Sequence, residues 1–379
     1  MRFCFLHYDF LNLEPPIAKS PYFAYNYSAM PSAIKNILII KPSSLGDIVL
    51  ALPALTALRK SFPDAKISWL IRPEFAGLLE NHPHLTQVIS FDRKFLAKAW
   101  FNPDAFFSLL SLIRKIRRNK FDIIFDFQGL FRTASLAWLS GCKNRFGLFD
   151  SREFAHLFYT DIIEQTQACT HLVDYYLKVV KAAGAADNAV QFVIPDDHPA
   201  ADSIKNLLKS NHIEPDNCAV LIPGSAQPDK RWPIDRFAEL ADRISSDFNF
   251  SIVAVGNASE ADIVEKLKTF SKTTIINLAG RTSLKQLTEL LKTARLVVTN
   301  DTGPGHIAAA LSVPLVMIFG WSNPLRLGPY RRKDCAVAIE PDKRGTKRRS
   351  TNPNHDIKAI TVDDVYKKVC QQLKSDSSR

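Results

Sequence analysis

The sequence predicts an α/β protein built from two doubly wound, Rossmann-like parallel sheets. From residue 37 onward, short β-rich runs alternate with longer helical patterns, which is typical of a sheet covered by helices. The same alternation restarts near residue 218, after a polar stretch. A chain of 379 residues also exceeds what one ordinary hydrophobic core accommodates, so two domains are expected.

The first half opens on a buried strand, a loop and a helix. Ile37 to Ile40 include no polar residue, which is typical of a strand in a parallel sheet. The loop KPSSLGD follows, and from Asp47 the apolar residues recur at helical spacing. Further strands are predicted in AKISWLIRP, QVISFD and FDIIFDFQG, and an amphipathic helix in PDAFFSLLSLIRKIRRNK. The KPSSLGD loop would lie at the carboxyl edge of the sheet, where open α/β proteins bind ligands.

The second half repeats this order. The predicted strands are 219–222, 251–255, 274–278, 295–299 and 315–319, and the predicted helices are 234–245, 259–270, 283–294 and 303–311. Ser259 and Ser283 stand where helix N-caps belong, because a serine side chain accepts a hydrogen bond from the first turn.

Four parts are expected along the chain: an extension over 1–30, an N-terminal domain over 31–205, a C-terminal domain over 206–345, and a polar loop with a final helix over 346–379. That final helix could pack back on the N-terminal domain. The extension is too polar around His7 and Asp9 for a signal peptide, so we expect a disordered tail or an upstream start. No apolar run approaches 18 residues, so no membrane-spanning helix is predicted.

The net charge of +11 indicates an acidic partner: nucleic acid, an anionic membrane surface or a phosphorylated substrate. Basic residues gather over 93–98, 114–120 and 343–349, without the interleaved aromatic residues of a nucleic-acid platform. An anionic membrane surface is therefore favoured over nucleic acid. Six scattered cysteines show no metal-binding spacing and are expected to be reduced thiols of a cytosolic chain.

The segment VVTNDTGPGHIAAAL is the strongest candidate site. A strand ends at Asn300 and a helix begins near Gly303, so the backbone N–H groups of Thr302 and Gly303 would form an anion site. His306 lies in the first turn of that helix and faces the same mouth. Ordinary turn glycines and a hydrogen-bonded helical histidine would give the same pattern, and spacing alone leaves both interpretations open.

Three other residues have two interpretations each, one functional and one purely structural. Lys230, in IPGSAQPDKRW, would overhang the sheet edge as a point charge for phosphate, or be a solvated lysine beside Arg231. Glu260 follows a strand and could bind a ribose hydroxyl pair, or simply favour the helix dipole. Asp47 could be a functional carboxylate or only a helix N-cap.

The motifs SSLGDIVLALP, DKRWPIDRFAEL and NDTGPGHIAAAL together resemble the signatures of the ADP-heptose:lipopolysaccharide heptosyltransferases, glycosyltransferase family 9, over about residues 35–330. The stretches KAWF, FDIIFDFQGLFRTASLA and DSREFAHLFY are most similar to members that add the first heptose to Kdo, the heptosyltransferases I. The resemblance implies a GT-B fold, with two Rossmann-like domains facing a central cleft: an acceptor-binding N-terminal domain over 31–205 and a nucleotide-sugar-binding C-terminal domain over 206–345. It also implies an inverting reaction with no required metal or other cofactor, and the sequence has no D-x-D pair.

The resemblance also implies roles for individual residues. Asp47 falls on the family's catalytic base. The donor-binding residues would be Ser225, Lys230, Glu260, Asp301, Thr302, Gly303 and His306. The family's ribose-contacting acid falls on Glu260, and Asp262, two residues later, is the alternative match. The acceptor-binding residues would be Lys94, Lys98 and Arg152, of which the two lysines correspond only loosely.

We therefore expect an inverting, metal-independent transfer of heptose from ADP-L-glycero-D-manno-heptose to the Kdo of the lipopolysaccharide inner core. Alternatives are a family 9 transferase with another nucleotide sugar or acceptor, such as a second heptose or other surface glycan, and a non-catalytic nucleotide-sugar-binding protein. A nicotinamide-dependent dehydrogenase is disfavoured, since no dinucleotide fingerprint is present. The expected partners are ADP-heptose, Kdo-lipid A and the anionic inner-membrane surface, with no nucleic acid. We expect a cytoplasmic monomer that is peripheral on the cytoplasmic face of that membrane.

Overall fold

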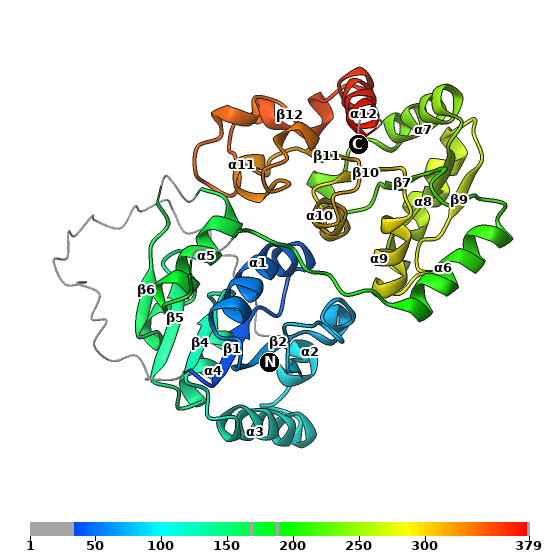
Figure 1. Cartoon of the computed structure of the whole chain (residues 1–379). Coiled ribbons are helices and arrows are strands. Elements are labelled where there is room, and N and C mark those ends of the chain that lie inside the picture. The colour runs from blue at the N-terminus through cyan, green and yellow to red at the C-terminus, as the bar shows by residue number, and fades with distance from the viewer. Residues whose placement is uncertain (1–33, 167–169, 187–188, 377–379) are drawn as a thin grey trace, which may run out of the picture. The chain divides into compact units, whose positions relative to one another are not determined.

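Two six-stranded parallel sheets, each flanked by helices, form the part of the chain that the structure describes (Figure 1). The structure is a computed structural model that describes residues 34–166, 170–186 and 189–376, so the extension expected over 1–30 lies outside the described residues. The predicted fold class of two doubly wound α/β sheets is confirmed. Within the described ranges, no helix has both the length and the apolar character needed to cross a bilayer.

The first sheet has the strand order β3-β2-β1-β4-β5-β6, with all neighbours parallel. Its strands are β1 (Asn36–Ile40), β2 (Lys66–Ile71), β3 (Gln87–Ser90), β4 (Ile123–Asp126), β5 (Asn144–Leu148) and β6 (Asp161–Ile163). The helices of this first half are α1 (Leu45–Ser61), α2 (Arg93–Leu96), α3 (Pro103–Arg118), α4 (Phe131–Leu139) and α5 (Leu172–Ala182). As predicted, Ile37 to Ile40 are fully buried, because Leu38 and Ile40 share a core with α3 and α4.

The second sheet has the strand order β12-β11-β10-β7-β8-β9, again with all neighbours parallel. Its strands are β7 (Cys218–Ile222), β8 (Ser251–Ala254), β9 (Ile275–Asn277), β10 (Leu296–Asn300), β11 (Leu315–Phe319) and β12 (Ala336–Ala338). The helices of this second half are α6 (His198–Ser210), α7 (Ile234–Phe248), α8 (Ala261–Phe270), α9 (Leu284–Lys292), α10 (Gly303–Ala310), α11 (Pro324–Leu327) and α12 (Val362–Asp376). Counted from the first strand of each half, the two sheets have the same strand order.

Short 3₁₀ helices connect these elements. They are η2 (Pro73–Leu78), η3 (Ala155–Phe158), η5 (Pro228–Lys230), η6 (Ala258–Glu260), η7 (Lys333–Cys335), η8 (Pro341–Lys343), η9 (Pro353–His355) and η10 (Ile357–Ala359). One predicted helix cap is confirmed, since Ser283 accepts a hydrogen bond from the Gln286 N–H at 3.2 Å. The other is wrong. Asn257 accepts from the Ser259 N–H at 2.8 Å, so the cap lies two residues earlier and η6 precedes α8.

The C-terminal helix α12 packs on the second sheet. Its buried residues Val365, Val369 and Leu373 belong to the core formed by α7, α8 and the strands of the second half. The Trp232 indole N–H in that core donates to the Ile360 carbonyl oxygen, just before α12, at 2.9 Å. The expectation that this helix packs back on the N-terminal domain is therefore wrong, because its apolar face packs against α7 and β11.

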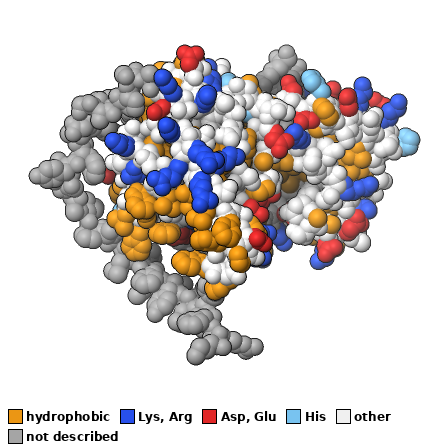
Figure 2. Space-filling view, turned by 90° about the horizontal axis from the view of Figure 1, so that it is seen from below, with side chains coloured by type: hydrophobic (Ala, Val, Ile, Leu, Met, Phe, Trp, Pro, Cys, Tyr) orange, Lys and Arg blue, Asp and Glu red, His pale blue; other side chains and the backbone are white. Residues whose placement is uncertain are grey.

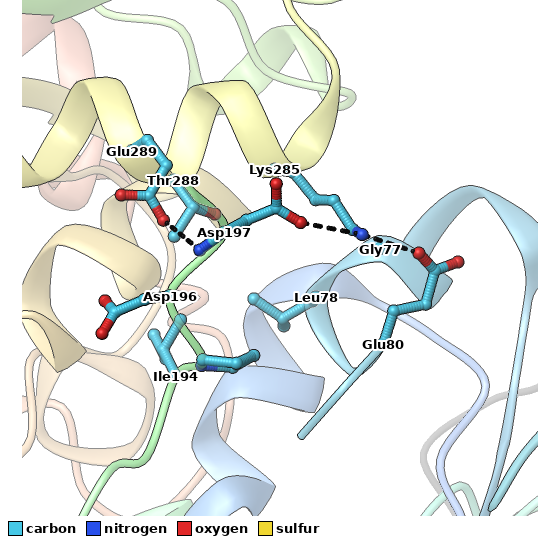
Figure 3. Close-up of a pocket in the computed structure, with 10 residues that line it drawn as sticks. Gly77, Leu78, Glu80, Ile194, Asp196, Asp197, Lys285, Thr288 and Glu289 are labelled. Carbon is cyan, nitrogen blue, oxygen red and sulfur yellow. Dashed lines mark hydrogen bonds and ion pairs between the residues drawn. The ribbon is translucent and has the colours of Figure 1, made fainter. Parts of the chain in front are cut away.

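The segment that leads into α6 is tied to both halves by one lysine. Lys285 of α9 lies 2.9 Å from a carboxylate oxygen of Asp197 and 2.9 Å from one of Glu80, which follows η2 in the first half (Figure 3). Glu289, one turn further along α9, accepts from the Asp197 N–H at 3.1 Å. The hollow among these residues holds only about 10 Å³, so this region is a packed joint with no room for a ligand.

Candidate active site

A cavity of about 540 Å³ opens where loops of the two halves meet, at the carboxyl ends of β1, β7 and β10. Open α/β sheets bind ligands at this edge, beside the strands where the order reverses. The cavity is lined by every residue that the sequence places in catalysis or donor binding: Asp47, Ser225, Lys230, Glu260, Asp301, Thr302, Gly303 and His306. The structure thus brings together residues that are up to 259 positions apart in the sequence, from Asp47 to His306.

The starts of α1 and α10 approach each other at two glycines. A Cβ atom on Gly46 would lie 2.5 Å from Cδ2 of His306, and one on Gly303 would lie 2.7 Å from the Leu45 Cβ. Both distances are too short for a real contact, so these two positions require glycine. Two helix N-termini therefore border one cavity, and each offers free N–H groups and a positive dipole end to an anion.

Asp47 lies inside the first turn of α1. The helix begins at Leu45 with Ser44 as its N-cap, so the interpretation of Asp47 as the N-cap is wrong. Asp47 occupies the third helical position and accepts from the Ser44 hydroxyl at 3.0 Å and the Ser44 N–H at 3.4 Å. This is a capping-box arrangement, which leaves the second carboxylate oxygen free of Ser44. The Asp47 side chain lines the cavity and is 19% exposed.

Two cations flank the Asp47 carboxylate. The buried Lys41 Nζ lies 3.6 Å from Oδ2, and Arg348 Nη1 lies 3.9 Å from Oδ1. Burial raises the pKa of Asp47, but the charges of Lys41 and Arg348 and the hydrogen bonds from Ser44 together outweigh it, so the pKa is below its ordinary value. The carboxylate is therefore unprotonated at neutral pH and able to accept a proton.

Sequence reasoning missed both of these cations. Lys41 is the first residue after β1, in the KPSSLGD loop. Its position at the carboxyl edge of the sheet could therefore have been predicted from the preceding strand. Arg348 belongs to the basic run 343–349, which lies about 300 positions from Asp47. No local pattern links it to Asp47, and only the fold brings them together.

Lys230, Asp301 and His306 form a connected group in the part of the cavity wall that the second half contributes. Lys230 Nζ lies 2.5 Å from Asp301 Oδ2, and His306 Nε2 lies 3.6 Å from Asp301 Oδ1. Burial raises the pKa of Asp301, but the interactions with His306 and with the Lys230 charge hold the pKa well below its usual range. The ammonium group is thus fixed by a buried carboxylate, and the Lys230 side chain remains 24% exposed at the cavity.

Ser225 and Glu260 complete the wall that the second half contributes. The Ser225 carbonyl oxygen accepts from the Arg231 guanidinium at 2.7 and 2.9 Å, which fixes the loop after β7. Glu260 is buried at the end of η6, and its Oε2 accepts from the Asn257 N–H at 2.9 Å. Glu260 lines the cavity, whereas the alternative Asp262 is not among its lining residues. Glu260 is therefore both a cap and a cavity residue.

The three residues expected to bind the acceptor lie elsewhere. Lys94, Lys98 and Arg152 are exposed and are not among the residues that line the cavity. Arg152 instead belongs to a group that we call the arginine cluster, which comprises Arg72, Arg93, Arg132 and Arg152 and follows β2, β3, β4 and β5. Burial and then the charge of Arg93 lower the pKa of Arg132; Glu153 opposes this effect, and the charges of Arg152 and Arg72 add to it, so each of these charged groups lies near Arg132.

The arrangement offers an ionised carboxylate on one wall, and a cation with a helix N-terminus on the other. In the described part of the chain, no group of three or more histidine, cysteine, aspartate or glutamate side chains is placed to hold a metal ion. A carboxylate can take a proton from a hydroxyl group, and the opposite wall can stabilise a diphosphate. The geometry thus suits transfer of a group from a nucleoside diphosphate to an alcohol.

Comparison with known proteins identifies relatives over most of the chain. The family model "Glycosyltransferase family 9 (heptosyltransferase)" matches residues 109–357. The lipopolysaccharide core heptosyltransferase OpsX of Haemophilus influenzae is 28% identical, over 81% of this chain and 85% of its own. Lipopolysaccharide heptosyltransferase 1 of Salmonella typhimurium is 26% identical, over 79% of this chain and 93% of its own.

Solved structures show the same fold. A family 9 glycosyl transferase from Veillonella parvula matches with a TM-score of 0.77 and 25% identity, over 90% of this chain and 98% of its own. The ADP-heptose heptosyltransferase II of E. coli matches with a TM-score of 0.72 and 21% identity, over 90% of this chain and 99% of its own. The E. coli heptosyltransferase WaaC with ADP matches with a TM-score of 0.70 and 24% identity, over 89% of this chain and 99% of its own.

Proposed function

Since the chain belongs to glycosyltransferase family 9 and is a glycosyltransferase, we propose that it transfers heptose from ADP-L-glycero-D-manno-heptose to the Kdo of the lipopolysaccharide inner core, with inversion. The observation that carries this proposal is the cavity that is lined by Asp47 from the first half and by Lys230 from the second half. The relatives named as heptosyltransferases, one of them solved with ADP, support the donor.

In this mechanism Asp47 accepts the proton of the acceptor hydroxyl while that oxygen attacks the anomeric carbon of the heptose. The bond from the anomeric carbon to the diphosphate oxygen breaks on the opposite face, and ADP leaves with the bonding electron pair. Lys230 and the N–H groups at the start of α10 stabilise the negative charge that develops on the diphosphate. Asp301 holds Lys230 in place, and Ser225 and Glu260 would contact the phosphates and the ribose.

The identity of the acceptor is less constrained than the identity of the donor. Relatives at 25–28% identity include enzymes named as heptosyltransferases 1, 2 and 3, so a second heptose or another surface glycan is the second candidate acceptor. Lys94, Lys98 and Arg152 lie outside the cavity lining and would act only on parts of a large acceptor that extend beyond it. A non-catalytic role fits less well, because both the base and the cation face the cavity.

We further propose a cytoplasmic monomer that works on the cytoplasmic face of the inner membrane, where a lipid-linked acceptor such as Kdo-lipid A would be anchored. The net charge of +11 supports attraction to an anionic membrane surface.

Turnover of ADP-heptose by the purified chain tests the proposal. With Kdo-lipid A we expect ADP release in step with a product mass increased by one heptose. The same assay with an acceptor that already carries one heptose separates the two candidates, because turnover with that acceptor alone would favour the second. Absence of turnover with both acceptors would exclude the proposed function.

A further inference from the structure

Exposed aromatic side chains gather on one face of the first half. We call this face the aromatic surface; its exposed aromatic residues are Trp100, Phe101, Phe106, Phe107, Phe131, Trp138, Phe149 and Phe154, and the exposed Leu157 adjoins them in sequence. Trp100 and Phe101 are 91% and 92% exposed. Figure 2, which looks from below at α3 and its neighbours, shows hydrophobic side chains massed beside a group of Lys and Arg side chains.

The aromatic surface extends over three neighbouring helices. Phe106 and Phe107 at the start of α3 meet edge to face at 5.7 Å. Phe131 and Trp138 of α4 contact Phe158 of η3, with ring centroids 5.4 and 6.1 Å apart. The helix α4 packs against both α3 and η3. Isolated exposed apolar residues are common, but so many exposed rings on neighbouring helices mark an interaction surface.

The arginine cluster borders the aromatic surface. Arg132 directly follows Phe131, and Arg152 precedes Phe154 by two residues. Glu74 and Glu153 offset part of this charge, since Glu74 forms an ion pair with Arg72 and Glu153 faces Arg132. The last turn of α3 adds further exposed cations: Lys115, Arg117 and Arg118. Apolar and basic groups thus share one face.

We propose that the aromatic surface and the arginine cluster together dock the protein on an anionic lipid bilayer. Tryptophan and phenylalanine side chains insert at the boundary between headgroups and acyl chains, and arginines bind anionic headgroups. A second copy of the chain fits this face less well. In a twofold dimer the same patch would meet itself, and the arginines around it would face like charges.

Docking in this way explains how a large lipid-linked acceptor could reach the cavity. The arginine cluster follows strands β2 to β5, so it lies at the same carboxyl edge of the first sheet as the loop that carries Asp47. The purpose of docking rests on the proposed function, but the binding itself can be measured without any substrate.

Co-sedimentation of the full-length chain with vesicles tests this proposal. We expect binding to phosphatidylcholine vesicles that contain phosphatidylglycerol, little binding to phosphatidylcholine alone, and weaker binding as salt rises and screens the arginines. The double variant Trp100→Ser/Phe101→Ser should lower the partition coefficient by about tenfold or more, because two aromatic rings no longer bury their area. Phe270→Ser is the matched control, since Phe270 is 59% exposed on α8 of the second half.

Three results would overturn the docking proposal. They are absent binding to the anionic vesicles, equal binding by the double variant and the wild type, and a concentration-dependent dimer that the double variant abolishes. The last result would assign the surface to a second copy of the chain. Activity separates this proposal from the proposed function: the double variant should keep wild-type turnover of a deacylated, water-soluble acceptor and lose turnover of Kdo-lipid A in vesicles. Vesicle binding without any turnover would contradict only the proposed function.

A second inference concerns the loop of residues 344–349. The buried Asn323 holds this loop, because its Nδ2 donates to the carbonyl oxygens of Gly345 and Lys347 at 2.9 Å each. The buried Arg326 donates from Nη1 to the carbonyl oxygen of Thr346, also at 2.9 Å. Such contacts fix the loop backbone, so the position of Arg348 beside the cavity is built into the fold.

We infer that Arg348 is a positioning residue that keeps the Asp47 carboxylate ionised and oriented toward the acceptor. The guanidinium lies 3.9 Å from Asp47 Oδ1, on the side opposite to Lys41. The titratable and charged groups around this pair come from five elements or loops: Lys41, Tyr176, His306, Asp150 and Arg326. Lys41 and Arg348 are the two whose positive charges lower the pKa of Asp47.

The pH dependence of kcat/KM tests this inference, which rests on the proposed function. In Arg348→Gln the pKa of Asp47 should rise, so the acid limb of the profile should move to higher pH, because the base must be unprotonated to act. Arg348→Lys should restore part of the shift. The matched control is Arg349→Gln, since Arg349 pairs with Asp229 instead.

A lower kcat with an unmoved acid limb in Arg348→Gln, or an equal shift in the control, would refute the inference. Carbon-13 NMR titration of the Asp47 carboxylate without substrate gives the same shift independently of turnover. If the wild type shows no turnover but the titration shows the shift, the proposed function fails while the effect of Arg348 on Asp47 stands.

Discussion

Replacing Asp47 by Asn is expected to lower kcat by about 10²-fold or more, because a general base typically contributes 10²–10⁴-fold. The asparagine side chain has the same shape and can still accept hydrogen bonds from Ser44, so the start of α1 should persist. ADP binding should change little, since Asp47 lies on the wall opposite to Lys230. Steady-state kinetics and calorimetric titration with ADP measure the two effects separately.

Ser44→Ala is the control that separates catalysis from helix capping. It removes the hydroxyl that donates to Asp47 at 3.0 Å but leaves the carboxylate in place. If Asp47 serves only the capping box, both variants should lose similar stability and similar activity. Turnover close to wild type in the Asp47→Asn variant would return Asp47 to a purely structural role.

The second large effect is expected for Lys230→Ala, which should raise the Kd for ADP by about tenfold or more and also lower kcat. In the proposed mechanism the lysine interacts with the diphosphate both when it is bound and when it departs, and charge-assisted contacts of this kind are among the stronger hydrogen bonds. Calorimetric titration with ADP gives the first quantity, and initial rates at saturating ADP-heptose give the second.

Lys230→Ala also leaves the buried Asp301 carboxylate without its closest cation, 2.5 Å away. An unpaired buried charge destabilises a fold, so part of any loss could come from the site collapsing. The double variant Lys230→Ala/Asp301→Asn removes that unpaired charge and should recover stability, measured as Tm, without recovering ADP affinity. An unchanged Kd for ADP in a folded Lys230→Ala variant would contradict the assignment of Lys230 to the donor.

Much of the fold was predictable because residues that end helices and strands separate most of the elements in the sequence. In the second half every predicted strand and helix is present within three residues of its predicted bounds, since apolar runs such as Leu315–Phe319 end at glycine, proline or polar residues. The start of α1 was misplaced by two residues. The S-x-x-D spacing of Ser44 and Asp47 is that of a capping box and is present in the sequence. It was missed because the helix was predicted to begin where the apolar residues first recur at helical spacing.

The residues that sequence reasoning missed share a physical cause: each depends on contacts between distant segments. The apolar stripe of α12 shows that one face is buried but does not say against which half. Arg348 reaches Asp47 only because Asn323 and Arg326 fix the loop that carries it. The exposure of Trp100 and Phe101 was also hidden, because aromatic residues beside an amphipathic helix usually indicate a core.

The shared strand order of the two sheets bears on how such an enzyme can change its specificity. Each half carries its own loops at the carboxyl edge of its own sheet, and in the proposed mechanism the first half binds the acceptor and the second half binds the donor. We therefore expect recombination of whole halves between relatives to exchange the two preferences independently. A few contacts would have to be inherited as pairs for a chimera to work. They include Gly46 with His306, Glu80 with Lys285, Asp47 with Arg348, Asp150 with Arg326 and Asp174 with Tyr330. A chimera that keeps these contacts should fold with an intact cavity at its junction.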